Sequence, residues 1–496
     1  MKLRSQEILT KEILSGIVIA IALIPEAIAF SFVLGVNPMV GLYTSVIIGF
    51  ITAIFGGRPG MISAATGSVA AVFAPLVKNY GIDYLIIAVI LMGIFQIIFG
   101  LLNIGKLFRL ISKPIMLGFV NGLAIVILMA QLEQFKVPGT EIWLSGIDML
   151  IMLSLTSFTF LMVVIIPKYI KAVPATLIAI IITTIIALFL QQFNFNIYTV
   201  KDMTLAGKAA VTSSLPPLNN ETLKIILIPS LSAALVGLVE SLLTLNLLDE
   251  LTNTRGHTKK EAIAQGLANI VTGLFGGMGG CAMIGQSMIN YTNGARKYLS
   301  TFCAALFLLF FISIGKNIIS IIPLASLVGV MMVVVYKTFA WDSLVLYKKS
   351  SKFDIFIIIL VAGVTVITGN LALGVLLGVL CSMAKFTWSK TTNLNFVKTA
   401  NQEQDILILQ INGILFFGSE KIFKDEVKAI EDEMIKEKIK NLELDLQNAK
   451  IVDYSAANAV IEQVLKLREK NLNIDLKNLT EDSKNKLIRI NALLLK

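Results

Sequence analysis

The sequence predicts an α-helical membrane protein of about fourteen spanning segments, followed by a small soluble α/β domain. Of the 496 residues, 56% are hydrophobic and 15% are charged, whereas soluble globular proteins carry about 25% charged residues. Between Glu12 and Lys390 the apolar runs are mostly about 17 to 25 residues long, the length of a helix that crosses about 30 Å of hydrocarbon. After Trp388 the composition changes and charged residues become frequent.

The basic residues are divided unequally between the connections of the predicted spans. One set carries most of them, including Arg58, Arg255, Lys259, Lys260, Arg296 and Lys297. The opposite set carries few, among them Lys78, Lys136 and Lys201. Because lysine and arginine collect on the cytoplasmic side, we predict an inner-membrane protein with an even number of spans and both termini in the cytoplasm. The net charge of +10 then reflects orientation in lipid, and no nucleic-acid partner is expected.

The tail has the residue periods of a soluble domain. We place the boundary at about Thr391, with a membrane domain over residues 1–390 and a cytoplasmic domain over residues 391–496. Within the tail, the pattern predicts strands at 406–417, 441–446 and 472–476, and helices at 419–437, 455–469 and 482–495. Strands that alternate with helices are typical of a small α/β layer fold.

The membrane part contains an internal repeat. The sextet at residues 55–60 (FGGRPG) recurs at 275–280 (FGGMGG), and a short stretch rich in small residues follows each copy. About 30 residues before each copy an acid interrupts an apolar segment, Glu26 in the first half and Glu240 in the second. Paired, glycine-interrupted segments at matching positions indicate a transporter site built from broken helices, with inverted halves if each has about seven spans. Chance recurrence of a glycine-rich sextet is the alternative.

Each broken segment is expected to begin a half-helix whose free N–H groups and positive dipole end point into the protein. Two such ends that face each other would bind an anion without a fixed cation. The first predicted N-terminal turn holds Ser63, Ala64, Ala65, Thr66 and Gly67, and the second holds Cys281, Ala282, Met283 and Ile284. Small residues let a substrate approach the backbone closely. The alternative is that they only permit tight helix crossing.

The two buried acids are the candidates for coupling. An ionised carboxylate such as that of Glu240, inside an apolar helix, must meet a cation, a proton or a polar cavity. Thr244 lies one turn further on and could add an oxygen ligand for Na⁺. Glu26, which follows Pro25, is the second candidate, and a structural hydrogen bond is the alternative for both acids. No cofactor is expected beyond co-transported Na⁺ or H⁺, and Na⁺ at Glu240 and Thr244 is the only metal site considered.

The remaining chemistry-bearing residues predict no enzyme. Asp249 and Glu250 are expected to be solvated at a helix end, and His257, the only histidine, cannot form a metal site alone. The sequence contains no nucleophile with a base, Walker loop or HExxH motif. Cys303 and Cys381 lie in apolar segments and are expected to be packed thiols.

Several segments, in order along almost the whole chain, resemble the SulP family of sulfate permeases and related anion transporters. They lie at residues 24–30, 41–43, 55–68, 240–243, 265–269 and 273–277. In the tail, residues 442–446 followed by 451–456 look like the strand-turn-helix element of a STAS domain.

The resemblance implies about fourteen segments in two inverted repeats, a core and a gate domain, elevator-like movement and a homodimer. It puts the substrate between the half-helices that start near Ser63 and Cys281. Many family members carry Gln where this chain has Glu26, so local charge is more negative here and cation coupling is favoured. STAS domains switched by phosphorylation carry Ser or Thr directly after the Asp of the turn, whereas Tyr454 follows Asp453 here, so no phosphoswitch is expected.

The resulting hypothesis is secondary active uptake of a small anion of the sulfate, bicarbonate or dicarboxylate type. Importing one negative charge against about 100 mV costs about 2.3 kcal/mol, so accumulation requires a coupled cation such as Na⁺ or H⁺. An anion exchanger or an uncoupled channel on the same fold is the first alternative. The second is a membrane-anchored sensor that binds a cytoplasmic protein partner through its STAS-like domain.

Overall fold

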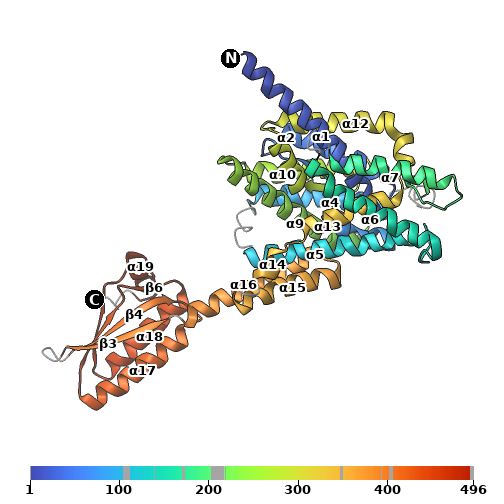
Figure 1. Cartoon of the computed structure of the whole chain (residues 1–496). Coiled ribbons are helices and arrows are strands. Elements are labelled where there is room, and N and C mark those ends of the chain that lie inside the picture. Colours follow the sequence, from blue (N-terminus) through green and yellow to red (C-terminus); the bar gives the residue numbers. More distant parts are fainter. Residues whose placement is uncertain are drawn as a thin grey trace. The chain divides into compact units, whose positions relative to one another are not determined.

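The structure is a computed structural model that describes residues 2–103, 112–138, 140–169, 174–202, 217, 219–346, 350–392, 394–401 and 406–491. The chain forms two compact units, Met1–Val379 and Leu380–Lys496 (Figure 1). We describe each unit separately.

In the described chain, fourteen helices of nine or more residues precede the first strand of the tail. They are α1 (Lys2–Leu34), α2 (Pro38–Phe55), α3 (Gly67–Tyr80), α4 (Ile82–Leu101), α5 (Lys113–Leu132), α6 (Gly146–Tyr169), α7 (Ala175–Gln191), α9 (Asn220–Thr252), α10 (Thr258–Leu274), α11 (Ile284–Thr292), α12 (Tyr298–Ser320), α13 (Leu324–Thr338), α15 (Lys352–Thr368) and α16 (Leu371–Thr392). The described residues of this part also form the short α14 (Asp342–Leu346), the 3₁₀ turn η2 (Glu133–Phe135) and two short strands, β1 (Ser63–Ala65) and β2 (Gly280–Ala282). Nine of the described helices are long and apolar enough to cross a membrane, which confirms the predicted α-helical membrane fold.

Polar caps and glycines fix where these helices start and how closely they cross. Asn37 accepts a 2.9 Å hydrogen bond from Met39 N at the start of α2, and Pro38 occupies the first turn, where no N–H partner is needed. Helices α4 and α10 cross at Gly93 and Gly266, where a Cβ on Gly266 would lie only 2.6 Å from the carbonyl oxygen of Gly93. Only glycine permits this approach, which lets α10 pack closely against α4.

The helices of the two halves pack in an interleaved manner. Helix α4 packs on α9 and α10, while α1 packs on α2 and α12. In a second group of helices, α5 packs on α15 and α13, and α13 packs on α6. Segments from far apart in the sequence therefore share one interior, and the broken segments after α2 and α10 meet inside the first group.

The tail folds as a sheet covered by helices, as the sequence predicts. Its strands are β3 (Asn395–Asn401), β4 (Ile406–Leu415), β5 (Asn441–Asp445), β6 (Ala449–Ile451) and β7 (Asn473–Lys477), and its helices are α17 (Glu420–Glu437), α18 (Tyr454–Glu469) and α19 (Glu481–Ile490). The order is β3-β4-β5-β7, with β6 also paired to β4; β3 is antiparallel to β4 and the other pairs are parallel. Buried aliphatic side chains of strands, α17 and α18 form its core.

The prediction for the tail misses two strands. Strand β6 has three residues, too few to show a period, and β3 is an edge strand rich in polar residues. Residues 492–495 of the predicted last helix lie outside the described residues. Helix α16 runs through Trp388 and Thr391, and the boundary near Thr391 stays a prediction.

Candidate functional site

Two three-residue strands from opposite halves of the chain pair in the interior of the membrane part. Strand β1 (Ser63–Ala65) is antiparallel to β2 (Gly280–Ala282), with Ala64 opposite Cys281, and all six residues are buried. Met283 N also donates to Ile62 O at 2.8 Å. Since backbone groups inside a membrane protein must be paired internally, the two segments satisfy each other.

A half-helix follows each strand. Helix α3 has 14 residues with Thr66 as N-cap, and α11 has 9 residues with Met283 as N-cap; neither cap side chain accepts a hydrogen bond from its helix. At 1.5 Å per residue these helices are about 21 and 14 Å long, too short to cross about 30 Å of hydrocarbon. Because the strands are antiparallel, the helices leave the pair in opposite directions, one from each end, and both N-termini are directed at the pair. The structure thus brings the two predicted helix beginnings together.

The predicted starting residues of the half-helices are wrong. We placed the first N-terminal turn at Ser63 to Gly67 and the second at Cys281 to Ile284, but the helices begin at Gly67 and Ile284. The residues before them are extended because they pair across the two halves, an interaction that a single-segment period cannot reveal.

Side chains hold the outer edges of the strand pair. Asn269 clamps Gly280, accepting from its N–H at 2.9 Å and donating to its carbonyl oxygen at 3.0 Å. On the other strand, Ala65 N donates to Ser45 Oγ at 3.2 Å. Asn269 and Ser45 are buried and were missed as site residues; the signal was a polar residue within an apolar helix.

Glu240 lies where the two broken segments cross. Its carboxylate accepts a hydrogen bond from Ser68 Oγ, in the first turn of α3, and another from Cys281 Sγ at 3.1 Å. Thr66 Oγ1 lies 3.2 Å from Cys281 Sγ and 3.3 Å from Ser68 Oγ. Glu240 is therefore joined to both halves through one polar cluster, of which sequence reasoning missed Ser68.

The hydroxyl of Thr244 has a local partner. It donates to the main-chain carbonyl of Glu240 at 2.8 Å, so it contacts that residue's backbone and not its carboxylate. In the described chain, no group of three or more His, Cys, Asp or Glu side chains forms a metal site. Na⁺ ligation at Glu240 and Thr244 stays a prediction.

Glu26 lies at the other half-helix. On α1, its carboxylate accepts a hydrogen bond from Gln286 Nε2 in the first turn of α11, and Gln286 is 5% exposed. Each acid thus contacts the half-helix of the opposite half: Glu240 meets α3, and Glu26 meets α11. The helix ends contribute about +0.5 charge each, so two ionised acids leave the region net negative.

The expectation for Asp249 is wrong. Its side chain is 20% exposed and pairs with Arg58 at 3.1 Å, and Arg58 also donates to Leu248 O at 2.8 Å and to the hydroxyl of Thr252. These contacts tie the FGGRPG segment to the end of α9. Glu250, in contrast, is exposed as predicted.

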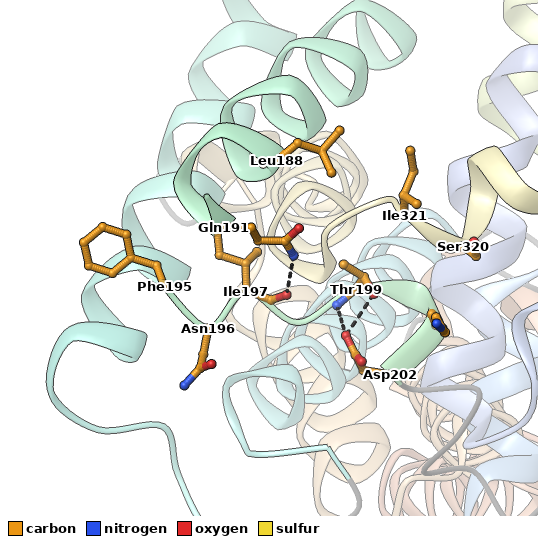
Figure 2. Close-up of a pocket in the computed structure, with 10 residues that line it drawn as sticks. Leu188, Gln191, Phe195, Asn196, Ile197, Thr199, Asp202, Ser320 and Ile321 are labelled. Atoms are coloured by element: carbon orange, nitrogen blue, oxygen red, sulfur yellow. Dashed lines mark hydrogen bonds between the residues drawn. The ribbon is translucent and has the colours of Figure 1, made fainter. Parts of the chain in front are cut away.

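Two cavities of about 320 Å³ each lie away from the strand pair. Figure 2 shows the first, between the end of α7 and the end of α12, where Gln191 donates to Ile197 O and Thr199 to Asp202. The second lies beside the end of α9. None of the predicted site residues lines either cavity, so neither is the predicted anion site.

Comparison with known proteins identifies both units. The sequence profile of the Sulfate permease family matches residues 9–361, and that of the STAS domain matches residues 398–493. YbaR of Bacillus subtilis, named as a candidate sulfate transporter, is 43% identical over 91% of this chain and 90% of its own length. The bicarbonate transporter BicA of Picosynechococcus is 27% identical over 85% of this chain and 81% of its own.

Solved structures agree in fold. The transmembrane domain of a cyanobacterial bicarbonate transporter, BicA, matches 73% of this chain and 97% of its own, with a TM-score of 0.63 and 28% identity. The murine Slc26a9 anion transporter in its inward-facing state matches 97% of this chain and 87% of its own, with a TM-score of 0.82 and 17% identity. The family prediction is confirmed: the chain belongs to the sulfate permease family and carries a C-terminal STAS domain.

Proposed function

We propose that the protein is a secondary active transporter that imports a small oxyanion together with Na⁺ or H⁺. The single observation that carries the proposal is the pairing of β1 with β2, which directs the N-termini of α3 and α11 at one strand pair inside the protein. Free N–H groups and two positive dipole ends form an anion site that needs no fixed cation. Thr66, with the free N–H groups in the first turns of α3 and α11, holds the anion.

Glu240 supplies the coupling in this proposal. Its carboxylate lies beside the anion site, held by Ser68 and Cys281. An anion that enters next to an ionised carboxylate is repelled unless a cation or proton binds too. Occupation of the two sites is thereby linked, and Glu26 plays an auxiliary part at α11.

The relatives support an oxyanion of the sulfate or bicarbonate type, since both substrates occur in their names. The core and gate division, elevator-type movement, a homodimer and an inner-membrane location with cytoplasmic termini belong to the same proposal. The STAS domain then lies in the cytoplasm, where it is available to a protein partner.

Uptake by the purified protein tests the proposal. Proteoliposomes are given labelled sulfate, bicarbonate or a dicarboxylate, with and without a Na⁺ gradient and a pH gradient. We expect at least one anion to accumulate above its equilibrium level only when one cation gradient is present. Transport that follows the anion gradient alone, indifferent to Na⁺ and pH, would establish an exchanger or channel instead.

A further inference from the structure

The cavity beside the end of α9 is lined by two arginines and by no carboxylate. Its lining includes Arg58, Arg296, Thr252, Thr254, Leu251 and Tyr291. Its volume of about 320 Å³ falls at the lower end of the range of about 300 to 1,000 Å³ found for small-molecule sites. Leu248, also in the lining, is two turns beyond Glu240, so the cavity starts about 12 Å along α9 from the coupling acid.

Arg58 is fixed in the wall of this cavity by partners within the protein. The side chain is 5% exposed, and its two terminal nitrogens bind Asp249, Leu248 O and the hydroxyls of Thr252 and Thr254. Its Nε is buried and has no hydrogen-bond partner among the described residues. A ligand in the cavity does not reach this buried atom, so Arg58 shapes the wall and the donors that are open to a ligand come from Arg296.

Arg296 is the second arginine in the wall of the cavity. Its guanidinium stacks 3.7 Å from the centre of the Tyr291 ring, and its Nη1 donates to the carbonyl oxygens of Tyr291 and Ala295, each at 2.6 Å. Within the described ranges no carboxylate forms an ion pair with this side chain. Stacking fixes the plane of the guanidinium and leaves its other nitrogens for a ligand.

We propose that this cavity is a second anion site, which binds the oxyanion group of a small inorganic anion or of a lipid headgroup through the guanidinium of Arg296, next to Arg58 in the wall. Planar guanidinium donors match the oxygens of sulfate and phosphate, and the hydroxyls of Thr252 and Thr254 complete the polar wall. Asp249 balances the charge of Arg58, so the excess charge of the wall comes from Arg296. Arg58 and Arg296 belong to the connections that are predicted to lie on the cytoplasmic side, where an imported anion is released.

Equilibrium binding of radiolabelled sulfate to the purified full-length protein in phospholipid-free detergent tests the site. We expect Arg296→Gln to remove one class of bound sulfate, weakening it at least about tenfold through loss of charge-assisted hydrogen bonds. Arg255→Gln, which neutralises an exposed arginine outside the cavity lining, should bind as the wild type does. Arg296→Lys should keep part of the binding because it keeps the charge.

Two further readouts separate the outcomes. Thermal unfolding of each variant shows whether lost binding reflects lost folding, and uptake into proteoliposomes reports the strand-pair site independently. If Arg296→Gln binds sulfate as tightly and as abundantly as the wild type, the second site is refuted, whereas absent uptake by the wild type refutes the proposed function alone. Sulfate that binds in detergent but is displaced in phosphatidylglycerol nanodiscs assigns the site to a lipid phosphate.

Discussion

The two half-helix beginnings share one geometry but differ in chemistry. At α3 the first turn presents the hydroxyls of Thr66 and Ser68, and Glu240 beside it also contacts Cys281 of the other half. At α11 the turn begins with Met283 and Ile284, so it offers backbone N–H groups and one amide, which Glu26 occupies. The backbone of both ends can attract an anion, but the α3 end adds the hydroxyls of Thr66 and Ser68. Of the two candidate coupling acids, Glu240 is the one bonded to both halves.

The largest expected difference separates the two acids. Glu240→Gln removes the coupled charge, which at about 100 mV is worth about 2.3 kcal/mol, or about fiftyfold in accumulation ratio. We expect concentrative uptake in proteoliposomes to collapse by this factor while downhill exchange persists. Glu250→Gln, on the exposed end of the same helix, is the matched control. Undiminished accumulation by Glu240→Gln would end the coupling assignment.

The next largest difference is expected between the stability effects of substitutions at the two edges of the β1–β2 pair. Asn269→Leu leaves both the N–H and the carbonyl of Gly280 without partners, at a cost of about 2 kcal/mol or more. Ser45→Ala leaves one strand group, the Ala65 N–H, without its partner and loses the local bond from Ser45 Oγ to Gly41 O, at a cost of about 1 kcal/mol. Thermal unfolding of the detergent-solubilised variants should therefore rank wild type above Ser45→Ala and Ser45→Ala above Asn269→Leu. Equal melting temperatures for all three would show that the clamps do not support the strand pair.

Substitutions at the two N-cap residues, Thr66 and Met283, test whether side chains or the backbone recognise the anion. Thr66→Val keeps the shape but removes the hydroxyl, and we expect the KM for the anion to rise about tenfold, the value of one lost hydrogen bond to a charged group. Met283→Leu leaves the backbone N–H groups of the first turn of α11 in place and should leave the KM within about twofold of wild type. A larger effect of Met283→Leu than of Thr66→Val would reverse the roles given to the two ends.

The smallest expected effect is at Glu26. Of the two half-helices, Glu26 is bonded to α11, and Glu26→Gln keeps a hydrogen-bonding group opposite Gln286. The accumulation ratio should therefore stay within about threefold of wild type. The steady-state accumulation ratio in proteoliposomes, at several Na⁺ concentrations and pH values, measures this effect. A collapse as deep as that of Glu240→Gln would make the two acids equal partners.

The sequence predicted what recurs along one segment and missed what depends on contacts between segments. The repeat, the two acids and the half-helices follow from composition and spacing, and the alternating elements of the tail follow from residue periods. The start of each helix shifted because three extended residues show no period until their partner strand is known. Ser68, Gln286 and the Arg58–Asp249 pair each join residues more than one hundred and fifty positions apart, a distance at which local pattern carries no information.

A structure of the protein bound to a transported anion tests the central claim most directly. With selenate in place of sulfate, or another heavy-atom analogue of the anion that the uptake assay identifies, the ligand can be located by its anomalous signal. We expect it between the N-termini of α3 and α11, within hydrogen-bond distance of Thr66 and of main-chain N–H groups from both halves. A transported anion found elsewhere, with the β1–β2 region in contact with protein alone, would contradict the account.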